Sequence, residues 1–297
     1  MGKIIFIGNY KGGVGKTTTV INLANYFSEE YGKKVLTIDL DPQSSLSEIQ
    51  VNNYSQKPLI DIPDNETLNY IFDLSIMKIK HYPSLRLDFS SDNIIKDRNN
   101  NYSYILSSLF YRDGEKGLDT LAIEMKDDIQ YLSILKNYID TIKNKFDFIL
   151  IDCPPSNNLI TRSAFLLSDF YIIPTVLDGL STNGVIHYIR TIKNTYKNYC
   201  EDSSKGILAK HYFGQEPKLL GIFYNMIRAQ VNYHQDDKDF KTALSGANID
   251  NNIVFNTNIN NYIAIARATA QGRISNEYAK DDFKELSKLI LDRINKL

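Results

Sequence analysis

The stretch Lys11–Thr18 (KGGVGKTT) combines glycines, lysines and hydroxyl side chains in an order that suits the binding of a polyphosphate. Glycines let backbone N–H groups turn toward phosphate oxygens, and a helix that begins directly after them adds the positive end of its dipole. Lys16 would then reach the β- and γ-phosphates, and the Thr17 hydroxyl would ligate Mg²⁺. The residues predicted to bind a nucleotide are Gly12, Gly13, Val14, Gly15, Lys16, Thr17 and Thr18.

Three carboxylates follow apolar runs and could complete such a site. Asp39 and Asp41 close the run that begins at Lys34, and Asp152 closes the run that begins at Phe148. In an open parallel sheet, ligands bind at the carboxyl ends of the strands, so these carboxylates should lie beside the glycine-rich loop. An alternative for Asp41, which precedes Pro42, is that it simply starts a helix.

The elements needed to position these residues can be predicted from apolar runs and helical periodicity. Strands alternate with helical patterns along most of the chain, which predicts an α/β fold with a doubly wound, mostly parallel sheet flanked by helices. The predicted strands are Lys3–Gly8, Lys34–Asp39, Phe148–Asp152, Phe170–Thr175 and Leu219–Tyr224. The predicted helices cover Val20–Phe27, Asp128–Lys145, Ser156–Ser168, Ser181–Tyr199, Val231–Leu244, Ile259–Gln271 and Ala279–Leu297.

The stretch from about Val51 to Asp127 is less periodic than the rest. The polar run Asp97–Tyr104 and the turn Asp113–Gly117 break it up. Because the sheet pattern resumes at Phe148 without a Pro- or Ser-rich linker, we expect one domain over residues 1–297, with a partly helical elaboration at about 51–127.

Composition narrows the class of protein. The 297 residues carry 34 Lys+Arg and 35 Asp+Glu, so a uniformly basic nucleic-acid binder is excluded and any DNA contact must come from a local patch. Two cysteines without a CxxC spacing exclude a disulfide scaffold and a cysteine-rich zinc site. No run has the length of a membrane span and no signal-peptide pattern is present, which predicts a cytoplasmic protein.

The loop closely resembles the deviant Walker A box of the ParA/MinD superfamily of ATPases. Tyr10 stands where the standard box has glycine, and Lys11 is the extra lysine that marks the variant. The segments DLDPQ from Asp39 and DCPPS from Asp152 are similar to the family's switch I and Walker B boxes. The resemblance implies a P-loop NTPase fold, ATP and Mg²⁺ as cofactors, and slow hydrolysis of ATP until a partner stimulates it.

The resemblance also implies roles for single residues. Lys11 would contact the nucleotide held by the opposite subunit of an ATP-bound homodimer. Asp41 would position the attacking water, Asp39 would act on Mg²⁺ indirectly, and Asp152 would hold Mg²⁺ through a water. Asn225 follows a strand similar to one that approaches adenine in the family, although Asn after a strand is more often a turn former. The catalytic residues would be Lys11, Lys16 and Asp41.

Within the superfamily, the resemblance is greatest to short ParA-type DNA-partitioning ATPases. This resemblance implies ATP-driven dimerisation, nonspecific DNA binding and a centromere-binding ParB-like partner. The implied role is plasmid or chromosome segregation, with the protein associated with the nucleoid. Residues 183–234 hold seven Lys/Arg against three Asp/Glu, which favours DNA, although a solvated helix face explains them equally well. The candidate DNA contacts are Arg190, Lys193, Lys197, Arg228, Arg267 and Arg273.

Two other classes of protein in the superfamily are alternatives to a DNA-partitioning ATPase. A MinD-like membrane-cycling ATPase needs a terminal amphipathic helix, and the apolar stripe from Phe283 to Leu297 could supply one. Its polar face is rich in acidic residues, whereas membrane-surface helices usually carry basic ones, so no membrane partner is expected. An iron protein of the nitrogenase-reductase kind is rejected, because neither Cys153 nor Cys200 is placed to bind a cluster.

Overall fold

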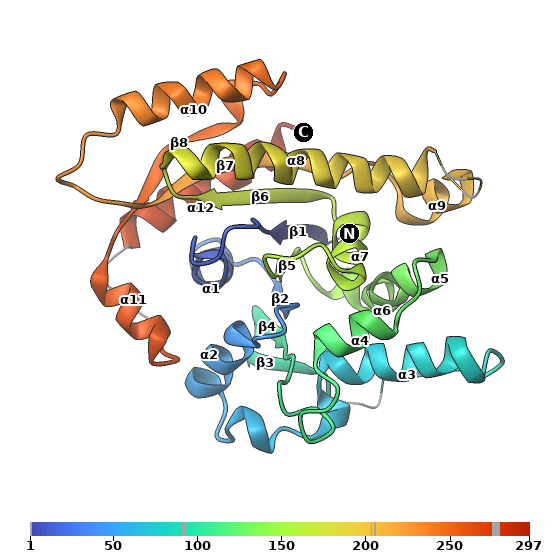
Figure 1. Cartoon of the computed structure of the whole chain (residues 1–297). Helices are drawn as coiled ribbons and strands as arrows, with labels where there is room; N and C mark the ends of the chain where they lie inside the picture. Colours follow the sequence, from blue (N-terminus) through green and yellow to red (C-terminus); the bar gives the residue numbers. More distant parts are fainter. Residues whose placement is uncertain (1, 91–92, 203, 205, 275–279) are drawn as a thin grey trace.

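The computed structural model describes residues 2–90, 93–202, 204, 206–274 and 280–297. These residues form an eight-stranded sheet with helices on both faces, in the order β3-β4-β2-β5-β1-β6-β7-β8 (Figure 1). Neighbouring strands are parallel except for β3 and β4, so the predicted doubly wound, mostly parallel fold is confirmed. The strands are β1 (Lys3–Ile7), β2 (Val35–Asp39), β3 (Ile95–Asn99), β4 (Tyr102–Ile105), β5 (Phe148–Asp152), β6 (Phe170–Thr175), β7 (Lys218–Ile227) and β8 (Val254–Asn260).

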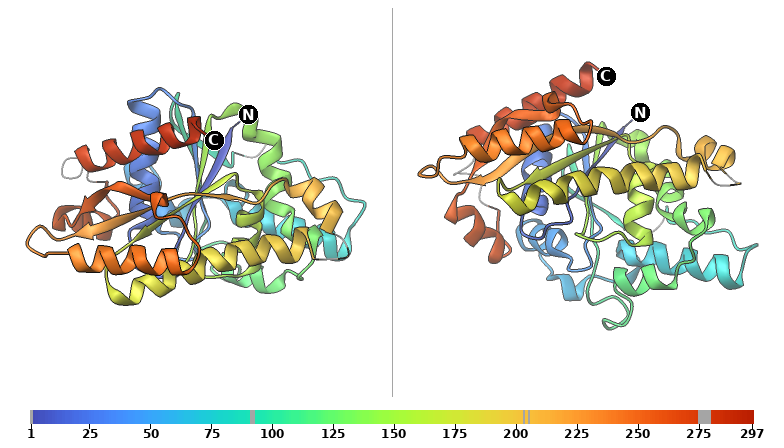
Figure 2. Two further views of the ribbon diagram at one scale, coloured as in Figure 1. Left: turned by 90° about the horizontal axis from the view of Figure 1, so that it is seen from above. Right: turned by 45° about the horizontal axis from the view of Figure 1, so that its top comes forward.

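Two helical layers cover the sheet, and Figure 2 shows α12 on one side with α8 and α10 on the other. The first layer contains α1 (Lys16–Glu29), α2 (Ser45–Tyr54), α11 (Ile263–Ala270) and α12 (Lys280–Asn295). The second contains α3 (Leu68–His81), α4 (Leu118–Glu124), α5 (Ile129–Leu132), α6 (Ile134–Ile142), α7 (Leu159–Leu167), α8 (Gly179–Cys200) and α10 (His234–Gly246), with α9 (Gly206–Phe213) packed on α8. Short 3₁₀ turns cover Leu59–Asp61, Asp64–Glu66, Lys143–Lys145 and Asn251–Ile253.

The core is divided by the sheet, because alternate side chains of each strand point to opposite faces. In β1, Ile5 and Ile7 pack under α1 and α12, whereas Ile4 and Phe6 pack under the layer that contains α7 and α8. Burial on both faces explains why the central strands are continuous apolar runs. The five strands predicted from such runs are confirmed: β5 and β6 have the predicted bounds, and the ends of β1, β2 and β7 are shifted by one to three residues.

The polar run Asp97–Tyr104, expected only to break up the 51–127 stretch, belongs to two strands that the sequence did not predict. It contains the end of β3 and most of β4, joined at a turn where Asn99 Oδ1 accepts hydrogen bonds from the backbone N–H of Asn101 and Tyr102. Tyr102 and Tyr104 are buried, and β4 pairs in parallel with β2. Sheet pairing and two aromatic side chains therefore compensate for the asparagines.

The chain near Asn260 also differs from the prediction. Residues Ile259 and Asn260, expected in a helix, belong to edge strand β8, and α11 begins only at Ile263. Asparagines make up three of the seven residues of β8, which hides its strand pattern. The helix predicted over Asp128–Lys145 is divided at Ser133 into α5 and α6.

Candidate nucleotide-binding site

The predicted site residues come together at the carboxyl ends of three adjacent strands. In the sheet order, β5 lies between β2 and β1, and Asp152 is in register with both Asp39 and Ile7. The glycine-rich loop leaves β1 directly beyond Ile7. Parallel pairing therefore brings the carboxylates to the loop, as expected for an open α/β sheet.

The loop has the backbone geometry of an anion cradle. Gly13 and Gly15 have left-handed φ values of 71° and 82°. A Cβ atom added at Gly12 or Gly13 would meet no described atom within 4 Å, so this side of the loop is open to a ligand. No side chain caps the N-terminus of α1 within the described residues, and its first turn carries no acidic residue. The N–H groups of that turn are thus free to bind phosphate oxygens.

Lys16 points inside the loop, where only 7% of the residue is exposed. Its Nζ donates to the Lys11 carbonyl at 3.3 Å. Burial lowers the pKa of Lys16, and the negative charges of Asp152 and Asp41 act in the opposite direction. A phosphate placed here would compensate the buried cation.

Asp152 is the carboxylate nearest to the start of α1. Its Oδ2 accepts a hydrogen bond from Thr17 Oγ1 at 2.6 Å, while its buried Oδ1 has no partner among the described residues. Burial raises the pKa of Asp152 well above its usual value, and the nearby charge of Asp39 adds to this rise. A cation close to Oδ1 would favour the charged carboxylate and so oppose this rise in the pKa of Asp152.

The hydroxyl of Thr17 and the carboxylate of Asp152 fit a Mg²⁺ ion that retains other ligands. Among the described residues, no group of three or more His, Cys, Asp or Glu side chains could hold a metal. Mg²⁺ is usually bound by one or two protein oxygens, with waters and substrate phosphates completing its shell. The unpartnered Asp152 Oδ1 is consistent with that mode of binding.

Asp39 is fully buried and saturated with hydrogen bonds. Its Oδ2 accepts from the Ser47 N–H at 2.8 Å and from Ser47 Oγ at 2.7 Å, and its Oδ1 accepts from the Asp41 N–H at 3.0 Å. Burial raises the pKa of Asp39 to about 6, although the hydrogen bonds from Ser47 lower it. Asp39 thus fixes the segment that follows β2, including the partly exposed Asp41 at the wall of the cavity.

Lys11 does not point into its own phosphate loop. Its Nζ lies 2.5 Å from Asp178 Oδ2 and 2.9 Å from Ser181 Oγ, at the N-terminus of α8. Asp178 also caps that helix by accepting from the Ser181 N–H at 2.8 Å. The Lys11 side chain is 38% exposed, in contrast to the buried Lys16. The two lysines of the loop therefore have different environments.

A cavity of about 640 Å³ extends from the phosphate loop toward α11. The loop end is lined by Gly12, Gly13, Gly15, Lys16, Thr17 and Thr18, and the far end by Met226, Ile259, Tyr262 and Ile265. An apolar and aromatic wall of this kind suits a nucleobase. None of these four wall residues was predicted from the sequence, because β7 extends past its predicted end to carry Met226 and Ile259 lies in β8, where a helix was expected.

Asn225 lies in the cavity wall, with both ends of its amide engaged. Its Nδ2 donates to the Val14 carbonyl at 2.8 Å, and its Oδ1 accepts from the Met226 N–H at 2.9 Å. A Cβ atom at Gly15 would come within 2.2 Å of Asn225 Nδ2, so glycine is required there. Asn225 supports the phosphate loop from β7, and its contact with adenine stays a prediction.

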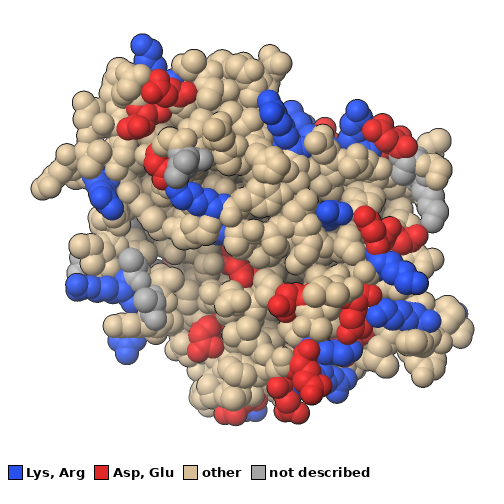
Figure 3. Space-filling model, in the orientation of Figure 1, with Lys and Arg blue, Asp and Glu red and all other residues tan. Residues whose placement is uncertain are grey.

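The six candidate DNA contacts are all exposed, but they do not form one cluster. Arg190, Lys193 and Lys197 lie along α8, and Lys197 Nζ is 3.7 Å from Asp202. Arg267 lies on α11 and Arg273 follows it, well separated from α8 in Figure 1, while Arg228 follows β7. On the face drawn in Figure 3, basic side chains are interspersed with acidic ones.

Comparison with known proteins assigns the chain to a family. A family model described as an AAA domain matches residues 2–204. The sequence is 26% identical over 272 residues to the chromosome-partitioning ATPase Soj of Treponema pallidum, covering 92% of this chain and 88% of that protein. The chain belongs to the ParA/MinD superfamily of ATPases.

Other relatives match over different lengths. The sporulation initiation inhibitor protein Soj of Bacillus subtilis is 29% identical over 245 residues, covering 82% of this chain and 84% of that protein. An uncharacterized protein of Mycobacterium tuberculosis is 30% identical over 183 residues, and there the match spans 62% of this chain and 49% of the relative. This chain thus spans about half the length of that relative.

Solved structures share the fold of nearly the whole chain. The McdA–ATP complex of Cyanothece superposes with a TM-score of 0.69 at 19% identity, covering 99% of this chain and 96% of that one. A plasmid partition protein of Borrelia burgdorferi bound to AMPPNP gives 0.65 at 21% identity, covering 100% and 99%. At these identities the likeness concerns the fold.

Proposed function

We propose that this protein is an ATP-dependent DNA-partitioning ATPase of the ParA type, which hydrolyses ATP to ADP and phosphate. The observation that carries the proposal is the position of Lys11. Lys16 already occupies the inside of the loop, while Lys11 reaches outward to Asp178. A lysine in that position could exchange its contact with Asp178 for the nucleotide of a second subunit, where it would stabilise charge that develops during phosphoryl transfer.

The residues of the site divide the chemistry among them. Lys16 and the N–H groups of the loop would bind the phosphates, Thr17 would ligate Mg²⁺, and Asp152 would hold the ion through a water. When bound, Mg²⁺ would neutralise negative charge on the phosphate oxygens. Asp41 orients the attacking water, and Asp39 acts through the hydrogen bonds that fix the backbone of Asp41.

The proposed cycle requires partners outside the chain. Binding of ATP drives formation of a homodimer, the homodimer binds DNA without sequence preference, and a ParB-like centromere-binding protein stimulates a hydrolysis that is otherwise slow. The proteins named Soj among the relatives support this cycle. We place the protein in the cytoplasm, at the nucleoid, and regard residues 1–297 as one domain because β4 of the elaboration pairs with β2.

The membrane-cycling alternative has lost its main support. Phe283, Leu286 and Ile290 of the C-terminal apolar stripe are buried against the sheet side that also packs α1. This part of α12 is not available to a bilayer surface without leaving the core. No helix in the described part of the chain has both the length and the apolar character of a membrane span.

The proposal is tested by the assembly state of Lys11→Ala. The wild-type chain should form a dimer with ATP and remain a monomer with ADP, as measured by light scattering. Lys11→Ala should bind ATP in a calorimetric titration and yet remain a monomer. An ATP-dependent dimer of Lys11→Ala would contradict a role of Lys11 in the opposite subunit.

A further inference from the structure

The turn at Asp113–Gly117 belongs to a loop at the nucleotide edge of the sheet. We refer to residues 107–117 as the 107–117 loop. Because β4 runs parallel to β2, with Ile105 in register with Ile38, the chain leaves β4 at the same edge as Asp39 and Asp41. In Figure 1 the loop lies at the bottom of the view, below β3 and β4.

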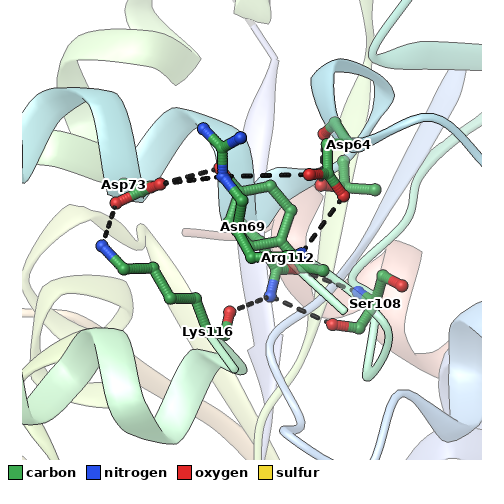
Figure 4. A network of polar contacts seen from close by, with 8 residues as sticks. Asp64, Asn69, Asp73, Ser108, Arg112 and Lys116 are labelled. Carbon is green, nitrogen blue, oxygen red and sulfur yellow. Dashed lines mark hydrogen bonds and ion pairs between the residues drawn. The ribbon is translucent and has the colours of Figure 1, made fainter. Parts of the chain in front are cut away.

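Helix α3 holds this loop in a fixed position (Figure 4). The Asn69 side chain accepts from the Ser108 N–H at 2.9 Å and donates to the carbonyls of Ser108 and Lys116 at 3.1 Å. The buried Asp73 accepts from Tyr111 OH at 2.9 Å and from Lys116 Nζ at 2.7 Å. Both ends of the loop are therefore tied to one helix.

Two large apolar side chains are exposed between these anchors. Leu109 and Phe110 are each 42% exposed, although Ser108 before them and Tyr111 after them are buried. The loop then passes through Arg112 and Asp113, whose φ values of 52° and 54° are uncommon for residues with side chains. A rigid loop that presents an aromatic and an aliphatic side chain is typical of protein contact sites.

The same loop is connected to the nucleotide site by hydrogen bonds. The Ser107 N–H donates to Ser47 Oγ at 2.8 Å, and Ser47 Oγ donates to Asp39 Oδ2 at 2.7 Å. The Ser107 hydroxyl also lies 3.0 Å from Ser44 Oγ, in the segment after Asp41. A displacement of the loop would thus disturb the group that fixes the backbone of Asp41.

The surroundings of Leu109 and Phe110 are acidic. The adjoining segments 59–66 and 107–119 are joined by contacts of Arg112 with Asp64. Arg112 and Lys116 are their only basic residues, and each contacts carboxylates already. Six acidic residues outnumber them: Asp61, Asp64, Glu66, Asp113, Glu115 and Asp119. Lys96 pairs with Glu66 and Arg112 contacts Asp64, which leaves Asp61, Asp113, Glu115 and Asp119 as the excess of negative charge.

We propose that the 107–117 loop is a docking surface for a basic segment of a partner protein, whose apolar side chains pack on Leu109 and Phe110. The acidic surroundings select the charge of this segment. The inference rests on the proposed function, since it gives a binding surface to the partner of that ATPase. Through Ser107 and Ser47, docking acts on Asp39 and on the backbone of Asp41.

A second copy of this chain is a poorer match for the surface. Two 107–117 loops that met across a two-fold axis would bring equally acidic segments together, and like charges oppose association. The alternating charges seen in Figure 3 offer no large basic area to face the loop on that side of the molecule. A basic partner segment avoids both difficulties.

Binding is measured without nucleotide, so that the result is independent of ATPase activity. The probes are three fluorescent peptides of equal length, one of alternating Lys and Leu, one of Glu and Leu, and one of Lys and Ser. We expect the full chain to bind the Lys/Leu peptide and to bind the other two more weakly. In Leu109→Ser/Phe110→Ser, affinity for the Lys/Leu peptide should fall by about tenfold or more.

Ile207→Ser is the matched control, because Ile207 is 92% exposed on α9, far from the loop in Figure 1. It should bind the Lys/Leu peptide like the wild type. Equal affinity of Leu109→Ser/Phe110→Ser and wild type, or equal binding of all three peptides, would overturn the proposal. A nucleotide-free dimer that Leu109→Ser/Phe110→Ser converts to a monomer would also overturn it, in favour of self-association.

The connection to the nucleotide site has a separate readout. The Lys/Leu peptide should change the rate of ATP turnover by the wild-type chain. Ser47→Ala should bind the peptide with unchanged affinity. The peptide should, however, no longer change the rate at which this variant turns over ATP. A response that persists in Ser47→Ala would overturn the connection, whereas failure of the wild type to bind ATP at all would instead contradict the proposed function.

Discussion

The buried charges of Lys16 and Asp152 lie close together, with the partly exposed Asp41 nearby at the wall of the cavity. Burial lowers the pKa of Lys16 and raises that of Asp152, so each group alone is unfavourable in its charged form. Phosphate oxygens would compensate Lys16, and Mg²⁺ would compensate Asp152. At the scale of single residues, the site is therefore better balanced with nucleotide and ion than without them.

Lys16→Ala should weaken binding of ATP by about 10- to 100-fold, because a charge-assisted hydrogen bond to a phosphate is lost inside the loop. Calorimetric titration of ATP with Mg²⁺ measures the change. Lys33→Ala, which removes an exposed lysine from the segment before β2, is the matched control and should bind ATP like the wild type. Unchanged affinity of Lys16→Ala would exclude this loop as the phosphate site.

Asp41→Ala should reduce the turnover of ATP by about 100-fold or more and leave the affinity for ATP nearly unchanged. A group that acts on the attacking water contributes mainly to the transition state. Single-turnover hydrolysis and calorimetry on the same preparation separate the two effects. If turnover of bound ATP is unaltered, Asp41 has no part in the chemistry and its position at the strand end is that of a helix start.

Helix α8 connects the phosphate loop with three candidate DNA contacts, so its N-terminus matters at the scale of elements. Asp178 caps this helix and also holds Lys11. Asp178→Asn should keep the cap, since Asn serves as well as Asp, and release Lys11. We expect the ATP-dependent dimer to form up to about 30-fold more tightly, because each of its two subunits loses a half-exposed ion pair that contributes at most about 1 kcal/mol.

Sedimentation at several protein concentrations gives the dissociation constant of that dimer. Ser181→Ala is a milder companion, because it removes only the second contact of Lys11 Nζ. It should show a smaller change in the same direction. Weaker dimerisation of Asp178→Asn would mean that Asp178 supports the dimer and does not compete for Lys11.

The segment after β2 is held through one buried carboxylate, which gives it a pH dependence. The pKa of Asp39 is about 6 in the folded chain and about 4 in an unfolded one, so between these values the folded state binds more protons. The free energy of unfolding of the nucleotide-free protein should therefore fall as pH rises from about 4 to 6. The contribution is at most about 3 kcal/mol.

Urea unfolding of wild type and Asp39→Asn measures this contribution as a difference. The wild-type value minus the variant value should decrease across that pH window and stay constant above it. Asp119→Asn, at an exposed carboxylate, controls for the loss of one negative charge. A difference that increases with pH would show that the hydrogen bonds from Ser47 dominate over burial.

The elements that carry the phosphate loop could be predicted because their signals are local. Strands β1, β2 and β5 are apolar runs, and the glycines and Lys16 of the loop are contiguous in the chain. Strand β4 and the edge strand β8 could not be predicted from local sequence. The asparagines of β8 and the polar run Asp97–Tyr104 around β4 hide the strand pattern, and both strands are held in the sheet by pairing with β7 and β2. Ser47, Ser107 and Asp178 were missed for a related reason, since their contacts join segments distant in sequence.

At the scale of the whole molecule, the candidate DNA contacts are too dispersed for one subunit to bind duplex DNA tightly. Arg190 and Lys193 are exposed neighbours on α8, whereas Arg267 and Arg273 lie near α11. The net charge of −1 provides no general attraction to phosphates. A homodimer doubles the number of contacts on one body, and linked sites gain affinity without any change within each subunit.

We therefore expect binding to random-sequence duplex DNA with ATP, and much weaker binding with ADP or without nucleotide. The logarithm of the association constant for DNA should fall linearly with the logarithm of the salt concentration, with a slope of about −0.9 per phosphate contacted. Arg190→Ala/Lys193→Ala should weaken binding and flatten that slope by about 4 in the dimer, since each lost phosphate contact removes about one unit. Lys288→Ala, on α12 at the opposite face of the sheet, is the control and should leave the slope unchanged. Gel shifts at increasing salt measure all three proteins, and equal slopes for them would place the DNA surface elsewhere than on α8.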